Sequence, residues 1–570
     1  MIGKLGVMFT PADRVDEILS FLRQNEVGRR ARIATPFGSR LISYADLTAS
    51  GRFLHFIEAW IRRVRPFYAN THTAVSSTGR ILTELREEAR GIIAESLGAG
   101  PEHEAIFCGS GATAAINKLV GLFGLRISEP LERRFNLSAH IPEEARPIVF
   151  VGPYEHHSNY LPWLESIARV VEVPAMDDGS VDLAFLERGL TEHATRELKI
   201  GAFSAASNVT GVLADVPAIT ALLHAHGAKA VFDYAAAAPY VPIDMTPDGG
   251  EPIDALVVSP HKFLGGPGGS GILVAHRDLF LTRTPERPGG GTVSYVGAVD
   301  FEAVDYVERL DEREEGGTPA ILCDLRAGTA FLVKRMVGEQ HILEHEKQLA
   351  ASSVARLVAN PKITVLGPTD GDRLAIISII FEDLHHDFAS GLLDQLFGVQ
   401  SRSGCACAGP YGHRLLKIDE RTSTRYRHVT ARGILGMKPG WVRLSLPYYA
   451  SAEDIEFILR AVEFVAEHGH EFLSSYRFSW RTGVWTHLDR QSAANRPLEL
   501  TIASLEEAAM SFGAGDHELP LSNEAIEAER ADYFVEAERL LATARARNAA
   551  APPVYNPGSG DDEVDELVWF

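Results

Sequence analysis

The chain has few cysteines and no long apolar run. Only four cysteines occur among 570 residues, too few to hold a chain of this length together with disulfides, so a cysteine with a special role is expected to be catalytic. The longest strongly apolar run, Leu374–Phe381, is too short to span a bilayer. The first residues, Met1–Leu19, carry charges where a signal peptide would be apolar. We therefore expect a cytoplasmic protein without a membrane partner.

Positive charge is also scarce. The chain has 55 Lys and Arg residues against 76 Asp and Glu residues, a formal net charge of −21. A field of that sign repels phosphate backbones, so nucleic acid is not an expected partner. The 45% of hydrophobic and 23% of charged residues are typical of a globular protein. The length indicates two or three domains.

Short β-rich runs alternate with helical patterns between about residues 100 and 275. This alternation predicts an α/β fold with a mostly parallel central sheet, and ligands gather at the carboxyl ends of such strands. The expected strands are Ala105–Cys108, Pro147–Val151, Val170–Val173, Ile200–Phe203, Ala230–Asp233, Ala255–Val258 and Gly271–Ala275.

Four segments are expected along the chain. After a loop-rich stretch over residues 286–320, long helices and an apolar strand at 374–381 predict a second, smaller α+β domain. The segments are an N-terminal segment (1–40), a large domain (41–325), a small domain (326–470) and a C-terminal extension (471–570). In the extension we expect a strand pair at Gly483–Leu488 and Leu498–Ile502, an amphipathic helix at Ser522–Arg547, and a disordered acidic tail at Ala551–Glu566.

Lys262 stands in the sequence Ser259-Pro260-His261-Lys262, after an apolar strand and before a glycine-rich run. A lysine amine attacks a carbonyl only when it is unprotonated, and a partly desolvated pocket favours the unprotonated amine. Enzymes that use pyridoxal 5′-phosphate (PLP) supply such a pocket. Taken alone, a lysine at a strand end is usually a solvated surface residue. Asp233 ends another apolar strand, and a buried aspartate can keep the PLP ring nitrogen protonated; the alternative for Asp233 is a helix-capping or turn residue.

Three further turns follow predicted strands. Gly111, Ala112 and Thr113 lie between a strand and a helix, where backbone amides can hold a phosphate, although such turns are often mere connections. The imidazole of His156 could lie against a cofactor ring, or be a structural histidine. Asn208 offers an amide to the phenolic oxygen of PLP, or belongs to an ordinary turn.

These motifs, in this order, resemble the class V aminotransferase family of fold type I PLP enzymes, and within it the cysteine desulfurase and selenocysteine lyase group. The resemblance covers roughly residues 40–465. It implies that Lys262 binds PLP as a Schiff base. The other implied contacts are Ser259, His261 and Thr113 with the phosphate, Asp233 with the pyridine nitrogen, Asn208 with the phenolic oxygen and His156 with the ring face.

The resemblance also has a looser match and a departure. Thr318 matches a segment that reaches the phosphate of the partner subunit, which implies a homodimer. Desulfurases usually carry a glutamine three residues after the aspartate, where this chain has Ala236, and alanine cannot donate a hydrogen bond to the cofactor.

The loop Gln400–Gly409 distinguishes the reactions. Desulfurases place a nucleophilic cysteine three residues after a loop glycine, which here gives Cys407, with the positive charge of Arg402 nearby. Cys405 could then receive the sulfur, or resolve the persulfide as a disulfide or polysulfide. The alternative is a pair of small buried residues. A metal site is not expected, because zinc sites use wider spacing and a second ligand pair.

An amino-acid substrate needs its carboxylate held, which arginine does bidentately. Arg443 and Arg402 match the family's carboxylate-binding arginines; the alternative for an arginine on a strand is a surface ion pair. We expect an enzyme that converts L-cysteine to L-alanine, keeps the sulfur on Cys407 as a persulfide, and passes it to a sulfur acceptor such as another protein. The alternatives are an aminotransferase or a cysteine or cystine lyase, for which Cys407 would be incidental, and a non-catalytic binding protein with the same fold.

Overall fold

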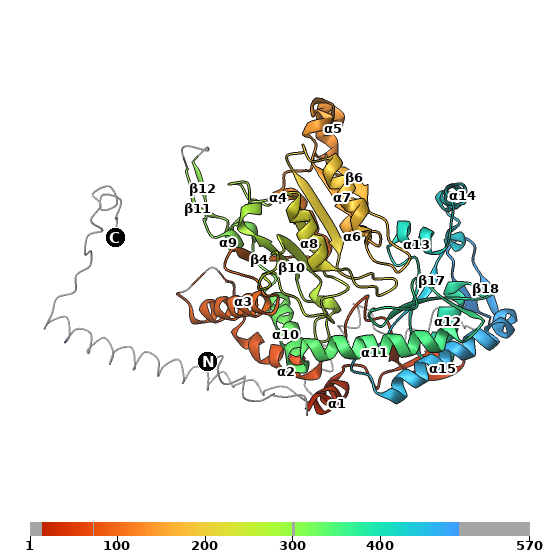
Figure 1. The fold of residues 1–570 in the computed structure, drawn as a ribbon. Coiled ribbons are helices and arrows are strands. Elements are labelled where there is room, and N and C mark those ends of the chain that lie inside the picture. The colour runs from red at the N-terminus through yellow and green to blue at the C-terminus, as the bar shows by residue number, and fades with distance from the viewer. Residues whose placement is uncertain (1–13, 72, 74, 299–302, 489–545, 547–570) are drawn as a thin grey trace. The chain divides into compact units, whose positions relative to one another are not determined.

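A seven-stranded sheet forms the centre of the larger part of the protein (Figure 1). The computed structural model describes residues 14–71, 73, 75–298, 303–488 and 546. In spatial order the strands are β4 (His103–Cys108), β10 (Gly271–His276), β9 (Ala255–Val258), β8 (Lys229–Asp233), β7 (Lys199–Ser204), β5 (Ile148–Val151) and β6 (Arg169–Glu172). β10 runs antiparallel to both of its neighbours, and all other neighbouring strands in the sheet are parallel. The predicted mostly parallel sheet is confirmed, and each expected strand falls within two residues of an observed one.

Both faces of this sheet are apolar because helices cover both. On β8, Val231 packs in one core with α4, while Phe232 belongs to a second core on the opposite face with α8 and α10. Strands buried on both faces are continuous apolar runs, as predicted for a parallel sheet. The helices of this part are α2 (His55–Val64), α3 (Ser77–Ser96), α4 (Gly111–Leu122), α5 (Glu129–Phe135), α6 (His157–Leu164), α7 (Leu183–Glu192), α8 (Val216–Ala225) and α10 (Ile321–Val337).

A second, four-stranded antiparallel sheet has its own core. Its strands in spatial order are β13 (Ile363–Val365), β14 (Ile376–Phe381), β17 (Trp441–Ser445) and β16 (Arg402–Gly404), and its helices are α11 (Glu339–Val358), α12 (His386–Phe397), α13 (Gly409–Leu415), α14 (Glu420–Ala431) and α15 (Ala452–His468). The smaller α+β part is therefore confirmed. Arg402 of β16 lies directly opposite Arg443 of β17, and residues so paired in antiparallel strands are close neighbours.

The N-terminal part holds helix α1 (Val15–Asn25) and a hairpin of β1 (Arg32–Thr35) and β2 (Gly38–Leu41). The next strand, β3 (Ser43–Tyr44), pairs in parallel with β15 (Val399–Gln400), just before the cysteine-containing loop. Residues after β3 are thereby held close to both sheets. The domain boundaries at residues 40, 325 and 470 stay predictions.

Two stretches are more structured or differently paired than expected. The loop-rich stretch contains a hairpin of β11 (Val293–Val296) and β12 (Val304–Tyr306), and helix α9 (Leu310–Glu314). The strand expected at 483–488 is β19 (Trp485–His487), but it pairs with β18 (Tyr476–Phe478). The second expected strand at 498–502, nearly all of the helix at 522–547 and the acidic tail lie outside the described residues. Among those that are described, no helix combines the length and apolarity needed to cross a membrane.

Candidate active site

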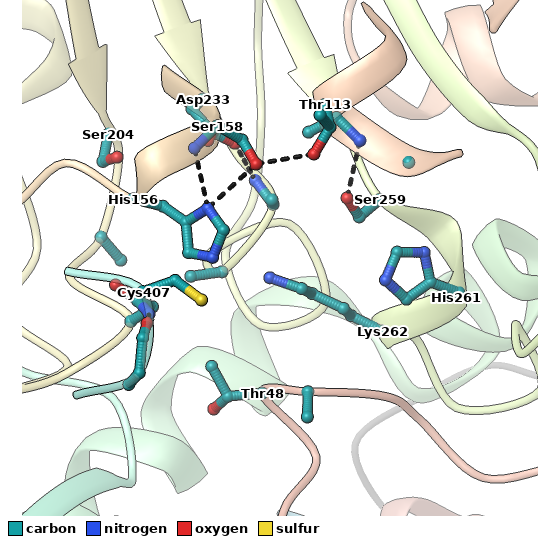
Figure 2. Close-up of a pocket in the computed structure, with 18 of the residues that line it drawn as sticks. Thr48, Thr113, His156, Ser158, Ser204, Asp233, Ser259, His261, Lys262 and Cys407 are labelled. Atoms are coloured by element: carbon teal, nitrogen blue, oxygen red, sulfur yellow. Dashed lines mark hydrogen bonds between the residues drawn. The ribbon is translucent and has the colours of Figure 1, made fainter. Parts of the chain in front are cut away.

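A cavity of about 250 Å³ lies at the carboxyl ends of the parallel strands (Figure 2). Ser204 and Asp233 end β7 and β8, and Ser259 follows β9 directly. Twelve of the residues predicted from the sequence line this one cavity, although they span positions 111 to 443: Gly111, Ala112, Thr113, His156, Asn208, Asp233, Ser259, His261, Lys262, Arg402, Cys407 and Arg443. Thr318 does not line it; its side chain is exposed and accepts a hydrogen bond from Asn70 (3.4 Å).

Lys262 ends a single 3₁₀ turn, Pro260–Lys262, that follows β9. Its amine points into the cavity, toward the space between His156 and Cys407 (Figure 2). Burial lowers the pKa of the amine to about 8, although the carboxylate of Asp233 acts in the opposite direction. A far larger fraction of this amine is therefore neutral near pH 7 than of an ordinary lysine, which is the state that can attack a carbonyl.

Asp233 lies at the end of β8 with only 4% of its surface exposed. Burial raises the pKa of its carboxyl, against the effects of a hydrogen bond from the Ala235 amide (2.8 Å) and of the charge on Lys262. A buried carboxyl of this kind is stabilised as an anion by a cationic partner in the cavity.

The start of α4 forms a concave cradle. Gly111 has φ of +60°, and a Cβ at this position would lie 2.8 Å from His261 Cε1 and 2.9 Å from Ser259 Oγ, so only glycine permits the close approach. The amide of Ala112 donates to Ser259 Oγ (2.9 Å), and the hydroxyl of Thr113 lies 2.6 Å from that of Ser158. A helix N-terminus surrounded by hydroxyls suits an anion such as a phosphate.

His156 caps α6 at the cavity wall. Its Nδ1 accepts from the amide of Ser158 (3.1 Å), whose hydroxyl also contacts it at 3.0 Å. Burial, followed by the charge on Lys262, lowers the pKa of His156 to about 3, so the ring is neutral. Ser158 thus links His156 to Thr113. Sequence reasoning missed Ser158, although its position in the first turn of α6 was a usable signal.

A buried carboxyl supports the wall behind His156. Glu155, which sequence reasoning also missed, accepts hydrogen bonds from the amide of Ser204 (2.7 Å), the hydroxyl of Ser204 (2.6 Å) and Asn159 (2.6 Å). Burial raises its pKa to about 7, while these bonds act to lower it. The contacts join the turn after β5 to the end of β7, and they fix the backbone that carries His156.

The two arginines share one carboxylate, Asp46. Arg443, 4% exposed, donates through Nη2 to Asp46 Oδ1 (2.8 Å) and through Nη1 to the carbonyl of Asn208 (3.0 Å), and its Nε has no partner. Arg402 Nε donates to Asp46 Oδ2 (3.1 Å). Because two guanidinium groups face a single carboxylate, this part of the cavity keeps a net positive charge. That charge suits the binding of a substrate carboxylate. Nothing in the sequence near Asp46 indicates this role, because its partners lie 356 and 397 positions away.

Cys407 lies on a strained, exposed loop. Ala406 and Cys407 have φ of 48° and 55°, the left-handed region that non-glycine residues seldom adopt and that is often found at functional sites. The thiol of Cys407 points to the same space as the amine of Lys262 (Figure 2). The amide of His157 donates to the carbonyl of Cys407 (2.8 Å) and so helps hold this conformation.

Asn208 contacts the loop rather than leaving its amide group free. Its Nδ2 donates to the carbonyl of Ala406 (2.8 Å), and its buried Oδ1 has no hydrogen-bond partner. An orphaned buried oxygen at a cavity wall indicates a place where a ligand or a water completes the hydrogen bonding.

Another group of side chains holds the start of the same loop. His385, His386 and Asp387 lie close enough together to bind a metal, but Nε2 of each histidine already contacts a carbonyl, Gly436 (3.1 Å) for His385 and Lys438 (3.2 Å) for His386. Asp387 accepts from the hydroxyl of Ser403 (2.6 Å) in β16. The group therefore orients the strand that leads to Cys407.

Comparison with known proteins assigns the family. Residues 46–458 match a sequence model of the family described as aminotransferase class-V. The chain belongs to that family. The family predicted from the motifs is therefore confirmed, and membership implies PLP as the cofactor.

This class-V member is similar to several desulfurases. A probable cysteine desulfurase from Halalkalibacterium halodurans is 30% identical over 441 residues, which cover 76% of this chain and 96% of that protein. A probable cysteine desulfurase from Streptomyces coelicolor is 28% identical over a region that covers 65% of this chain and 84% of that protein.

Solved structures confirm the fold. The apo cysteine desulfurase from Thermococcus onnurineus aligns with a TM-score of 0.61 at 23% identity, covering 78% of this chain and 97% of that one. The cysteine desulfurase CsdA from Escherichia coli aligns with a TM-score of 0.60 at 21% identity, covering 79% of this chain and 98% of that one.

Proposed function

We propose that this protein is a PLP-dependent cysteine desulfurase that converts L-cysteine to L-alanine and retains the sulfur on Cys407 as a persulfide. One observation carries the proposal: an amine of lowered pKa, a thiol and a pair of arginines, from Lys262, Cys407, Arg402 and Arg443, line the same cavity. An amine for the cofactor, a nucleophile for sulfur and a site for a carboxylate are the three groups the reaction needs.

The cavity walls fit PLP. The cradle at Gly111 and the hydroxyls of Thr113 and Ser259 suit its phosphate, Asp233 suits its ring nitrogen, and the neutral ring of His156 suits its face. When bound there, PLP supplies an electron sink for negative charge that develops on the substrate.

The remaining steps belong to the chain's own groups. Arg443 and Arg402 bind the carboxylate of cysteine and orient its side chain toward the loop. The neutral amine of Lys262 can accept the proton of the substrate Cα. The Cys407 thiolate then attacks the substrate sulfur: an S–S bond forms, the C–S bond breaks, and its electron pair stays on Cβ, which takes a proton to complete alanine.

A second copy of the chain is proposed to complete the site. Thr318 is exposed and does not line its own cavity, which suits a residue that contacts the cofactor phosphate of a partner subunit. The mass of the PLP-loaded protein in solution tests this: a dimer is expected, and in a monomer Thr318 would have no phosphate to contact.

Substitution of Cys407 tests the mechanism. We expect Cys407→Ser to lower alanine formation from cysteine by at least about a hundredfold while leaving cofactor absorbance unchanged, because the thiol acts after PLP is bound. Cys323→Ser is the matched control, since Cys323 lies on α10 and does not line the cavity. Undiminished alanine formation by Cys407→Ser would rule out the persulfide. Pyruvate and ammonia in place of alanine would instead identify a lyase.

A further inference from the structure

Cys405 lines a second cavity, separate from the one that contains Lys262. This cavity measures about 460 Å³ and lies against α13 and α14. Its volume is within the range of small-molecule sites, roughly 300–1,000 Å³. Cys405 is exposed, and its cavity shares no lining residue with that of Cys407. The two cysteines of one loop thus belong to two different cavities.

The second cavity combines apolar walls with positive charge. Leu416 and the rings of Tyr426 and Trp441 supply apolar and aromatic surface, and the basic side chains are His413, Arg427 and Lys438. None of its lining residues is an aspartate or glutamate, although the whole chain has a net charge of −21. A local excess of positive charge on an acidic protein favours an anionic ligand.

Trp441, a residue of the cavity wall, carries an unpaired buried donor. Only 1% of this residue is exposed, it is one of the residues that line the second cavity, and its buried Nε1–H has no acceptor in the protein. Buried donors are almost always paired in folded proteins. The wall of the second cavity therefore contains a residue whose hydrogen bonding is incomplete within the protein.

Cys405 and Cys407 are close together in the backbone, where the amide of Ala408 donates to the carbonyl of Cys405 (3.1 Å). Two residues of extended chain span at most about 7 Å, and the left-handed conformations of Ala406 and Cys407 turn the chain more tightly than that. The Cα atoms of Cys405 and Cys407 are therefore no farther apart than about 7 Å, close to the range over which two cysteines can be joined through sulfur.

We propose that Cys405 takes the sulfur from Cys407 and delivers it to a small anionic thiol bound in the second cavity. The proposal rests on the persulfide at Cys407. The Cys405 thiolate attacks the outer sulfur of that persulfide, a new S–S bond forms at Cys405, the old one breaks, and Cys407 leaves as a thiolate. The thiolate of the bound acceptor repeats the attack, frees Cys405 and departs as a persulfide. Each step exchanges one S–S bond for another, so no oxidant or reductant is consumed.

The test follows alanine in the first turnover and in the steady state, with 3-mercaptopropionate as the anionic acceptor and cysteamine as a cationic thiol of similar size. For Cys405→Ser we expect first-turnover alanine as in the unsubstituted protein and a steady-state rate with 3-mercaptopropionate at least about tenfold lower. Equal steady-state rates, or loss of the first-turnover alanine as well, would overturn the relay. A protein that forms no alanine at all would instead refute the desulfurase function.

A second variant tests the cavity without changing a cysteine. Arg427 and Lys438 are exposed, so their joint replacement by alanine is compatible with folding. We expect this double variant to raise the KM for 3-mercaptopropionate about threefold to tenfold and to leave the KM for cysteamine unchanged or lower. Equal increases for both thiols, or none for 3-mercaptopropionate, would contradict an anion-selective delivery site.

Discussion

The two walls of the Lys262 cavity differ in how firmly they are built. On the sheet side, Asp233 ends the buried strand β8 and Lys262 lies in the turn after the buried strand β9, so the core fixes their surroundings. On the loop side, Cys407 is exposed, has a left-handed backbone and is held through hydrogen bonds from Asn208 and His157 to the loop carbonyls. From this difference we infer that the sheet-side wall binds the cofactor and the loop-side wall selects the reaction. Substitutions on the loop wall should therefore leave cofactor binding measurable.

The largest effect is expected at the sheet wall. Lys262→Ala should remove the absorbance band of bound PLP, near about 410–430 nm, and lower alanine formation by more than about a thousandfold, because no other described lysine lines the cavity. Lys347→Ala, at a surface ion pair with Asp372, is the control and should retain both signals. A band that persists in Lys262→Ala would show that the cofactor attachment is wrongly assigned.

The arginines provide the next comparison, between a buried and an exposed group. Arg443→Lys should raise the KM for cysteine by about tenfold to a hundredfold, because a lysine cannot keep the two buried charged hydrogen bonds to Asp46 and Asn208. Arg402 is half exposed and makes one such bond, so Arg402→Lys should raise the KM by about fivefold or less. Steady-state kinetics with kcat measured separately checks the ranking. A larger effect at Arg402 would reverse the proposed roles.

The pH dependence of PLP incorporation tests the sheet wall alone. Only the neutral amine of Lys262 can attack PLP, and its pKa is lowered to about 8. The rate at which apoprotein incorporates PLP should therefore rise about tenfold from pH 6 to pH 7 and level off above pH 8. An ordinary lysine would let the rate climb to beyond about pH 10. Stopped-flow absorbance in buffers of constant ionic strength measures this profile, and a continued rise above pH 9 would contradict a desolvated amine.

The smallest effect is expected at Ala236, which lines the cavity where desulfurases usually have glutamine. Ala236→Gln should tighten PLP binding by about fivefold, the value of one added hydrogen bond. Fluorescence titration of the apoprotein with PLP measures the change. Weaker binding would mean that the side chain at 236 faces a different part of the cofactor.

The sheet and the family motifs could be predicted from the sequence because each depends only on a short stretch of neighbouring residues. Apolar runs that end in a glycine, aspartate or lysine place those residues at strand ends without knowledge of the rest of the fold. Asp46 and Glu155 escaped prediction for the opposite reason. The carboxylate of Asp46 gains its role only from two arginines more than 350 positions away, and Glu155 is defined by its burial beneath Ser204. The partner of β19 was missed because three-residue strands carry almost no register information.

Product analysis is the most direct test of the central claim that the loop wall directs this cofactor site to desulfuration. The PLP-loaded protein is incubated with L-cysteine under reducing conditions, and alanine, pyruvate, ammonia and sulfide are quantified. We predict one alanine for each cysteine consumed, with the sulfur released as sulfide. Pyruvate and ammonia in equal amounts, with no alanine, would contradict the account.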